Sequence, residues 1–316
     1  MPEMPEVQGL VVFLRGRAVG RSITRVSVAQ IAALKTFDPP VQALHGAVVT
    51  DVQRHGKFVD IACRTINTGS STGTGTGTGE ADRTAVAVAT PPDADVHLVF
   101  HLAKAGWLRW YETLPTTLIK PGRTPIALRV ALDDGSGFDL TEAGTKKSLA
   151  VSVVRDPADV PGIARLGPDP LDPDFTRDTL AGLLEGRRTQ IKGVLRDQSV
   201  IAGVGNAYSD EILHVARMSP YALAATLEPA AVDTLFAAMH ATLDEALAAA
   251  SGKPPADLKD AKRRGMRVHG RRGEPCPVCG DTVRSVFFAD NSLEYCATCQ
   301  TGGKVLADRR LSRLLK

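Results

Sequence analysis

The sequence lacks any run of about eighteen consecutive apolar residues, the length that a membrane-spanning helix requires. Its first residues also lack a basic segment followed by an apolar one, so they do not look like a secretion signal. Cysteine is scarce, and five residues are too few for a disulfide framework in a chain of 316 residues. These absences indicate a protein of the reduced cytoplasm, long enough for about two domains.

No strong excess of one charge marks the whole chain, whose formal net charge is +3. Basic residues are nevertheless concentrated near the C-terminus. Between Lys253 and Arg272 they outnumber acidic residues by six, and a basic tail follows over residues 304–316. This asymmetry suits a polyanion such as nucleic acid, although the charge alone is explained equally well by a solvated surface.

The first half of the chain predicts one helix followed by strands. Apolar residues recur with helical spacing over residues 5–17, whereas 22–63 and 96–155 are rich in β-branched residues. We therefore expect residues 1–155 to form a two-layer β-sandwich behind one leading helix. A Thr/Gly-rich insertion of low complexity, at about 67–94, is expected to be disordered because it cannot bury a core.

The second half predicts helices and a small C-terminal module, which makes the chain an α+β protein of several domains. A linker rich in Pro, Asp and Gly is expected over residues 156–175, and a helical domain over 176–266. The last part of that domain, the basic stretch 251–266, is expected to have little regular structure. A module with four cysteines follows at 267–303.

The four clustered cysteines predict a zinc site. Cys276-Pro-Val-Cys279 and Cys296-Ala-Thr-Cys299 form two C-x2-C pairs, one at each end of an expected β-hairpin. Four thiolates at this spacing fit tetrahedral Zn²⁺ and fill every ligand position, so we expect the metal to be structural. A redox or incidental cluster is the alternative. Cys63 lies in a strand-like run and is expected to be a core thiol.

The first residues offer a candidate nucleophile. Small Pro2 favours removal of Met1, which would leave a secondary amine at the start of the chain. An α-amino group titrates near ~7.7–8, so a good fraction is unprotonated at neutral pH and can form a Schiff base with an aldehyde or sugar C1′. The neighbouring carboxylate of Glu3 could move the protons. Many chains begin with Met-Pro for no catalytic reason, so this signal alone is weak.

A glycine-rich turn between two helices offers a candidate phosphate site. Residues 190–213 indicate a helix, a tight turn at Gly203 and Gly205, and a second helix that Asn206 could cap. The exposed amides at the start of that helix, and the Asn206 side chain, could hold a phosphate. An ordinary pair of antiparallel helices is the alternative.

Taken in order along nearly the whole chain, these motifs resemble the formamidopyrimidine-DNA glycosylase/endonuclease VIII family of base-excision repair enzymes. The resemblance implies an N-terminal β-sandwich, a helix-two-turns-helix domain and a C-terminal zinc hairpin. It also implies excision of a damaged base flipped out of duplex DNA, followed by β,δ-elimination at the abasic site. The motifs that carry it are Pro2-Glu3-Met4-Pro5-Glu6, Arg54-His55-Gly56-Lys57-Phe58, His101-Leu102, Gly203-Val204-Gly205-Asn206 and Cys276 to Gln300.

By matched position, the resemblance implies roles for individual residues. Pro2 would be the Schiff-base nucleophile and Glu3 the general acid and base, with Lys57 contacting phosphate and assisting the chemistry. Glu6 would support the site, and Asn206 would bind phosphate. His101 and Lys104 would face the DNA, Lys104 at the place where the family usually has a wedge such as methionine.

Three departures from the family pattern lie on the side expected to face DNA. A lysine is a poor filler for the hole that a flipped base leaves, and Lys104 stands at the wedge position. Residues 141–148 lack the void-filling Arg and Phe, and Asn291 stands where the family has a phosphate-binding arginine. The specificity for oxidised purines is therefore not carried over to this chain.

Three functions remain after these observations. The first is a bifunctional DNA glycosylase/abasic-site lyase that acts as a monomer on damaged double-stranded DNA in the cytoplasm, at the nucleoid. The second is a damaged-DNA-binding protein of the same fold that is non-catalytic or only a lyase. A zinc-stabilised protein whose site is vestigial is a third and weaker reading, because Pro2, Glu3 and Lys57 are all present.

Overall fold

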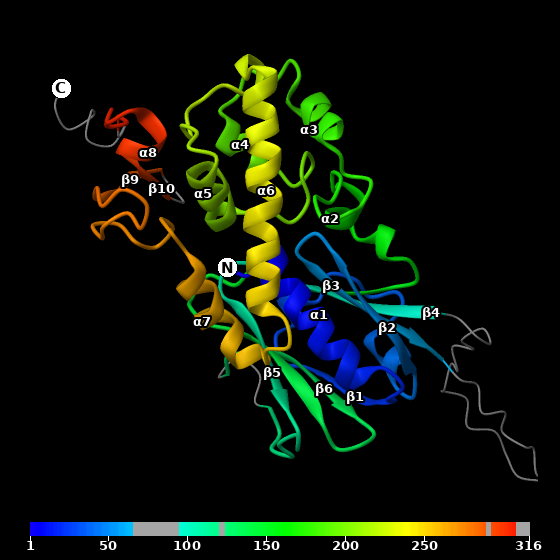
Figure 1. Cartoon of the computed structure of the whole chain (residues 1–316). Helices are drawn as coiled ribbons and strands as arrows, with labels where there is room; N and C mark the ends of the chain where they lie inside the picture. Colours follow the sequence, from blue (N-terminus) through cyan, green and yellow to red (C-terminus); the bar gives the residue numbers. More distant parts are fainter. Residues whose placement is uncertain (66–94, 120–123, 289–291, 308–316) are drawn as a thin grey trace, which may run out of the picture.

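Two four-stranded antiparallel sheets share one core in the N-terminal part of the protein, as a computed structural model shows (Figure 1). The structure describes residues 1–65, 95–119, 124–288 and 292–307. One sheet has the strand order β1-β6-β7-β5 and the other β2-β3-β4-β8. The strands are β1 (Ile23–Val28), β2 (Val48–His55), β3 (Phe58–Arg64), β4 (Asp95–His101), β5 (Gly106–Tyr111), β6 (Ile126–Leu132), β7 (Gly137–Glu142) and β8 (Ala150–Val154).

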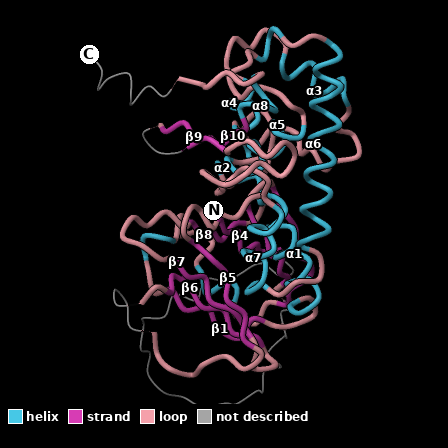
Figure 2. Tube along the Cα trace, turned by 60° about the vertical axis from the view of Figure 1, so that its left-hand side comes forward, coloured by secondary structure: helices cyan, strands magenta, loops and turns pink. Residues whose placement is uncertain are grey.

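The leading helix α1 (Met4–Ala18) ties the sandwich to the helical part of the protein. Val7, Leu10 and Leu14 are fully buried in the core that both sheets share. Met4, one turn earlier, belongs instead to the core of the helical part. The first turn of α1 therefore bridges two hydrophobic cores, and Figures 1 and 2 show the N-terminus at the junction between strands and helices.

The helical part is arranged around the long helix α6, as Figure 1 shows. Within the described ranges, no helix is both long and apolar enough to span a membrane. The helices that precede the C-terminal module are α2 (Pro161–Ala164), α3 (Arg177–Leu184), α4 (Ile191–Arg196), α5 (Asn206–Val215), α6 (Pro229–Ala250) and α7 (Pro255–Gly265).

The prediction of little regular structure over residues 251–266 is wrong, because α7 forms there. Proline at the first position and Asp257 in the first turn suit a helix start, and basic residues in the last turn suit its dipole. Apart from the proline at its start, the helix buries only Leu258 and Ala261, which form a narrow apolar stripe. Leu258 approaches α1 so closely that a Cβ at Gly9 would lie 2.9 Å from it. With so few apolar residues among many charged ones, the sequence shows no clear helical periodicity, and for this reason we did not predict the helix.

The C-terminal module is a two-stranded hairpin that packs beside α5. Strands β9 (Val283–Phe287) and β10 (Ser292–Cys296) pair antiparallel, and α8 (Ala297–Thr301) follows directly. The predicted fold class is thus confirmed: a sandwich behind one helix, a helical region and a hairpin with four cysteines. The domain boundaries stay predictions, and the insertion at 67–94 and Asn291 lie outside the described residues, as does most of the basic tail.

Candidate active site

The start of the chain is held between the two cores. The backbone N–H of Met4 donates a hydrogen bond to the carbonyl of Gly203, at 3.1 Å. Gly203 has a φ of +85°, and a Cβ there would lie 2.4 Å from the Met4 side chain. Pro2 is buried beside these contacts. The glycine turn between α4 and α5 therefore fixes where the first residues lie.

Glu3 is a buried carboxylate at the N-terminus of α5. Its oxygens accept hydrogen bonds from the N–H groups of Ala207 (2.9 Å) and Tyr208 (3.3 Å). A Cβ on Gly205 would lie 2.4 Å from the Glu3 carboxyl carbon, so only glycine leaves room for this contact. The amides that we predicted to hold a phosphate are thus occupied by Glu3. The positive end of the α5 dipole stabilises this negative charge.

Asn206 does not cap α5, contrary to our prediction. Gly205 occupies the N-cap position, and Asn206 is the first residue of the helix. Its side-chain nitrogen donates to the carbonyl of Ser292 in β10 at 2.7 Å, which links the helix to the hairpin. The Asn206 Oδ1 atom is buried and has no hydrogen-bond partner among the described residues. Its role in phosphate binding stays a prediction.

The Glu6 carboxylate accepts hydrogen bonds from the first turn of α1, from α5 and from α7. One carboxylate oxygen accepts hydrogen bonds from the Glu3 N–H and from Lys262 Nζ, both at 2.8 Å. The other accepts the hydroxyl hydrogen of Tyr208 at 2.5 Å. The Lys262 ammonium lies 3.8 Å from Glu3 and 4.7 Å from the centre of the Tyr208 ring. Neither Tyr208 nor Lys262 was among the predicted site residues.

The charges around Glu3 keep it ionised. Burial alone would raise its pKa, but Lys262, Lys57 and the amides of Ala207 and Tyr208 outweigh burial and lower it to about 2. Glu3 is therefore a carboxylate throughout the neutral range. In this ionised state Glu3 can accept a proton but cannot donate one.

Lys57 lies in the turn between β2 and β3 and is almost fully buried. Burial lowers the pKa of its ammonium, and the negative charge of Glu3 opposes that effect. Arg54, in the strand β2 that leads into this turn, forms a partly buried ion pair at 2.6 Å with Asp169, which lies between α2 and α3. The structure thus brings the predicted residues Pro2, Glu3 and Lys57 to one place.

His101 is the last residue of β4 and pairs with Phe58, the residue after Lys57. Burial and then the charge of Lys57 lower the pKa of its imidazole to about 4, so the ring is neutral at pH 7. The ring packs against Phe58, with 4.7 Å between centroids, and its Nδ1 accepts the N–H of Ala103 at 3.2 Å. These contacts fix the turn that carries the exposed side chain of Lys104.

A cavity of about 420 Å³ opens beside Pro2. Lys104 and Trp107 line one wall, and α7 lines another with Lys259, Lys262 and Arg263. Lys259 lies over the Trp107 ring, 4.4 Å from its centroid. Glu6 also lines the cavity, so cations outnumber anions there by four to one, which favours a ligand rich in negative charge or in hydrogen-bond acceptors.

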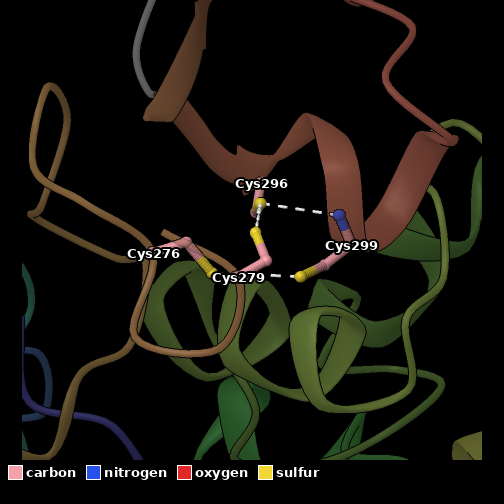
Figure 3. A group of neighbouring side chains, drawn as sticks. All are labelled: Cys276, Cys279, Cys296 and Cys299. Atoms are coloured by element: carbon pink, nitrogen blue, oxygen red, sulfur yellow. Dashed lines mark hydrogen bonds between the residues drawn. The ribbon is translucent and has the colours of Figure 1, made fainter. Parts of the chain in front are cut away.

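The four cysteines form a cluster that fits one zinc ion (Figure 3). The four sulfur atoms lie within 4.8 Å of one another, with Cys279 and Cys296 Sγ 3.3 Å apart and Cys276 and Cys299 Sγ 3.9 Å apart. Four Zn–S bonds of about 2.3 Å at tetrahedral angles place sulfur atoms about 3.8 Å apart. The predicted structural zinc is confirmed by this arrangement and by the hairpin that contains it.

Buried acidic residues of α5 bind the segment that connects α7 to the hairpin. Asp210 accepts hydrogen bonds from Lys192 Nζ at 2.6 Å and from the His269 ring at 2.8 Å. Glu211 accepts three backbone N–H groups, those of residues 267, 268 and 269. None of these contacts was predicted, because the residues lie far apart in the sequence and no motif indicates that they meet.

Comparison with known proteins identifies the class of this fold. Residues 1–147 match the formamidopyrimidine-DNA glycosylase N-terminal domain, 166–254 its H2TH domain, and 273–302 the zinc finger found in FPG and IleRS. The MutM (FPG) protein of Thermus thermophilus superimposes with a TM-score of 0.72 at 26% identity, over 96% of this chain and 100% of that one. A MutM structure in complex with carbocyclic 8-oxo-G DNA gives 0.75 at 22%, over 95% and 100%.

Sequence relatives agree with the structural match. A formamidopyrimidine-DNA glycosylase of Symbiobacterium thermophilum is 32% identical, over 98% of this chain and 93% of its own length. An uncharacterized formamidopyrimidine-DNA glycosylase-like protein of Mycobacterium tuberculosis is 58% identical, over 50% of this chain and 99% of its own length. The chain belongs to the formamidopyrimidine-DNA glycosylase family, as the resemblance predicted.

We expect the Glu3 carboxylate to make stability depend on pH. Its pKa is lower in the folded chain than its usual 4.5, so its contribution is complete above about pH 4.5 and is lost as pH falls toward 2. Urea unfolding should show that wild type loses about 2 kcal/mol more between pH 5 and pH 3 than Glu3→Gln. Glu185→Gln, which removes an exposed carboxylate, should keep the wild-type slope. Equal slopes for wild type and Glu3→Gln would contradict a buried, ionised Glu3.

We expect the cysteine cluster to bind one zinc ion per chain, measurable by elemental analysis of the purified protein. Replacing Cys276 and Cys279 with serine should abolish the bound zinc and raise hydrogen exchange across residues 273–302. Cys63→Ala removes a thiol from the sandwich core and should leave the zinc content unchanged. Stoichiometric zinc in the double variant would show that these thiolates are not the ligands.

Proposed function

We propose that this protein is a DNA glycosylase and abasic-site lyase that forms a Schiff base through the nitrogen of Pro2. The observation that carries the proposal is the convergence of Pro2, Glu3 and Lys57, with Pro2 lining a cavity whose charged residues are mostly cations. Membership of the glycosylase family supports it, and several solved relatives are described as bound to damaged DNA. The proposal requires that Met1 be removed, because the Pro2 nitrogen is otherwise an amide with no free electron pair.

The chemistry at an abasic site would proceed in balanced steps. The electron pair of the Pro2 nitrogen adds to the C1′ carbonyl carbon, the nitrogen releases its N–H proton, and the carbonyl oxygen takes up one proton to become a hydroxyl group. A second proton on that hydroxyl group allows it to leave as water, and an iminium ion remains. Removal of a proton from C2′ then expels the 3′ phosphate, because the iminium accepts the electron pair. Glu3, which is ionised and hydrogen-bonded to α5, would accept a proton in this sequence.

When the damaged base is still attached, its release would replace the carbonyl addition and the loss of water. Attack of Pro2 at C1′ would break the glycosidic bond, and the base would leave with the bonding electrons and gain a proton. The nitrogen would release its own proton, and opening of the sugar ring with protonation of O4′ would give the same iminium ion. The nucleotide must first turn out of the duplex, since C1′ is inaccessible within the stack. We propose that Lys57 and Asn206 contact the flanking phosphates and that the cavity beside Pro2 receives the flipped nucleotide.

A lyase without glycosylase activity, or a damaged-DNA-binding protein, is the second candidate. The exposed ammonium of Lys104 lines the cavity and is a poor filler for the gap in a base stack. An abasic site leaves no base to accommodate or release, so it suits this lining better than a bulky lesion does. The two candidates share Pro2 chemistry and differ in whether a base is released.

One experiment tests both candidates. The purified chain, with Met1 removal verified by mass spectrometry, is incubated with borohydride and either an abasic-site duplex or duplexes that carry different damaged bases. We expect a covalent adduct with abasic DNA, mapped by digestion to the peptide that begins at Pro2. An N-terminally extended chain of equal zinc content is the matched control, and it should give no adduct.

The outcomes separate the functions. An adduct and a free base from at least one lesion support the bifunctional enzyme, whereas an adduct with abasic DNA alone supports a lyase. Tight binding of abasic DNA without any adduct, by a chain with a free Pro2, contradicts Schiff-base chemistry and leaves a binding protein.

A further inference from the structure

The side chain of Lys262, on α7, contacts the first residues of the chain. Its Nζ lies 2.8 Å from a Glu6 oxygen and 3.8 Å from a Glu3 oxygen. It also donates a hydrogen bond to the carbonyl oxygen of Met1, at 3.3 Å. The side chain is largely enclosed by these groups and by the Tyr208 ring.

The contact with Met1 places the Lys262 ammonium close to the candidate nucleophile. The Met1 carbonyl carbon is bonded to the Pro2 nitrogen, and the carbonyl oxygen and that nitrogen are about 2.2 Å apart. Lys262 Nζ therefore lies within about 5.5 Å of the Pro2 nitrogen. Removal of Met1 takes away the carbonyl and creates an amine at this position.

Without Lys262, the surroundings of this amine would favour its protonated form. Glu3 and Glu6 are both adjacent to it, and two carboxylates stabilise an ammonium ion. Lys57 faces Glu3 from the β2–β3 turn, and Lys259 faces the start of the chain from α7. Lys104, Arg263 and His269 also line the cavity that Pro2 lines. Among the residues that the structure describes, Lys262 is the cation that contacts both the carboxylates and the backbone of the first residues.

We propose that Lys262 is a positioning residue that keeps the nitrogen of Pro2 unprotonated and therefore nucleophilic. A cation beside an amine disfavours addition of a second positive charge, which is a known way to activate amine nucleophiles. Its ion pair with Glu6 also occupies a carboxylate that would otherwise bind the ammonium form of Pro2. The amino group of Met1 shows the same effect, because burial and then the charge of Lys262 lower its pKa. The inference rests on the proposed function.

The test measures the pH dependence of adduct formation. Borohydride trapping on an abasic-site duplex is followed under single-turnover conditions from pH 5 to pH 9, with DNA in saturating excess. In wild type the trapping rate should rise with pH as the Pro2 amine loses its proton. In Lys262→Gln the midpoint of this rising limb should move at least about one pH unit higher, so that trapping near pH 6 slows about ten-fold. The rate should recover toward wild type at pH 9. Lys262→Arg, which keeps the charge, should retain the wild-type profile.

Arg264→Gln is the matched control, because it removes an equal charge from an exposed position on the same helix. We expect it to leave the midpoint of the limb unchanged. Each variant is first shown to have the zinc content of wild type. A rate lowered equally at every pH in Lys262→Gln, or an unshifted limb, would overturn the inference.

A second measurement needs no variant. The Pro2 nitrogen of wild type, labelled with ¹⁵N-proline, is titrated by NMR in the absence of DNA. We expect a midpoint below the ~7.7–8 of an unperturbed α-amino group. A midpoint at or above that range overturns the inference even if Lys262→Gln does not fold. Failure of wild type to form any adduct overturns the proposed function instead, so the two failures are distinguishable.

Discussion

The carboxylate of Glu3 on the N-terminus of α5 is the interaction on which the rest of the site depends. It joins residues 204 positions apart in the chain and directs a buried negative charge at two backbone amides. A buried carboxylate without partners would be strongly unfavourable. The amides, the helix dipole, Lys57 and Lys262 together supply the compensation, so all of these groups must be in place at once. Gly205 is required because any side chain there would collide with the carboxylate.

This interaction makes the geometry of the first residues depend on how the two parts of the protein fit together. Met4 packs in the helical core and Leu10 in the sandwich core, so a shift of one part against the other would displace Pro2. The partly buried ion pair of Arg54 with Asp169 also resists such a shift. A nucleophile at the end of a chain would ordinarily be free to move. Here the bridging helix and its capping carboxylates hold it.

Much of this could be predicted from local sequence. The spacing of apolar residues predicted α1, and the spacing of Cys276, Cys279, Cys296 and Cys299 predicted the metal cluster, because both patterns reflect short-range geometry. The occupation of the α5 amides by Glu3 could not be predicted, since a helix start with free amides reads equally well as a phosphate site. Lys262 was also missed. Its helix has a narrow apolar stripe among many charges, and its partners Glu3 and Glu6 lie at the opposite end of the sequence.

The most direct test of this account is a crystal structure of the borohydride-reduced complex with an abasic-site duplex. The account predicts a single covalent bond between the Pro2 nitrogen and C1′, with the Glu3 carboxylate still bound to the N–H groups of Ala207 and Tyr208. A bond from C1′ to a lysine side chain such as Lys57, or a Glu3 carboxylate turned away from α5, would contradict it.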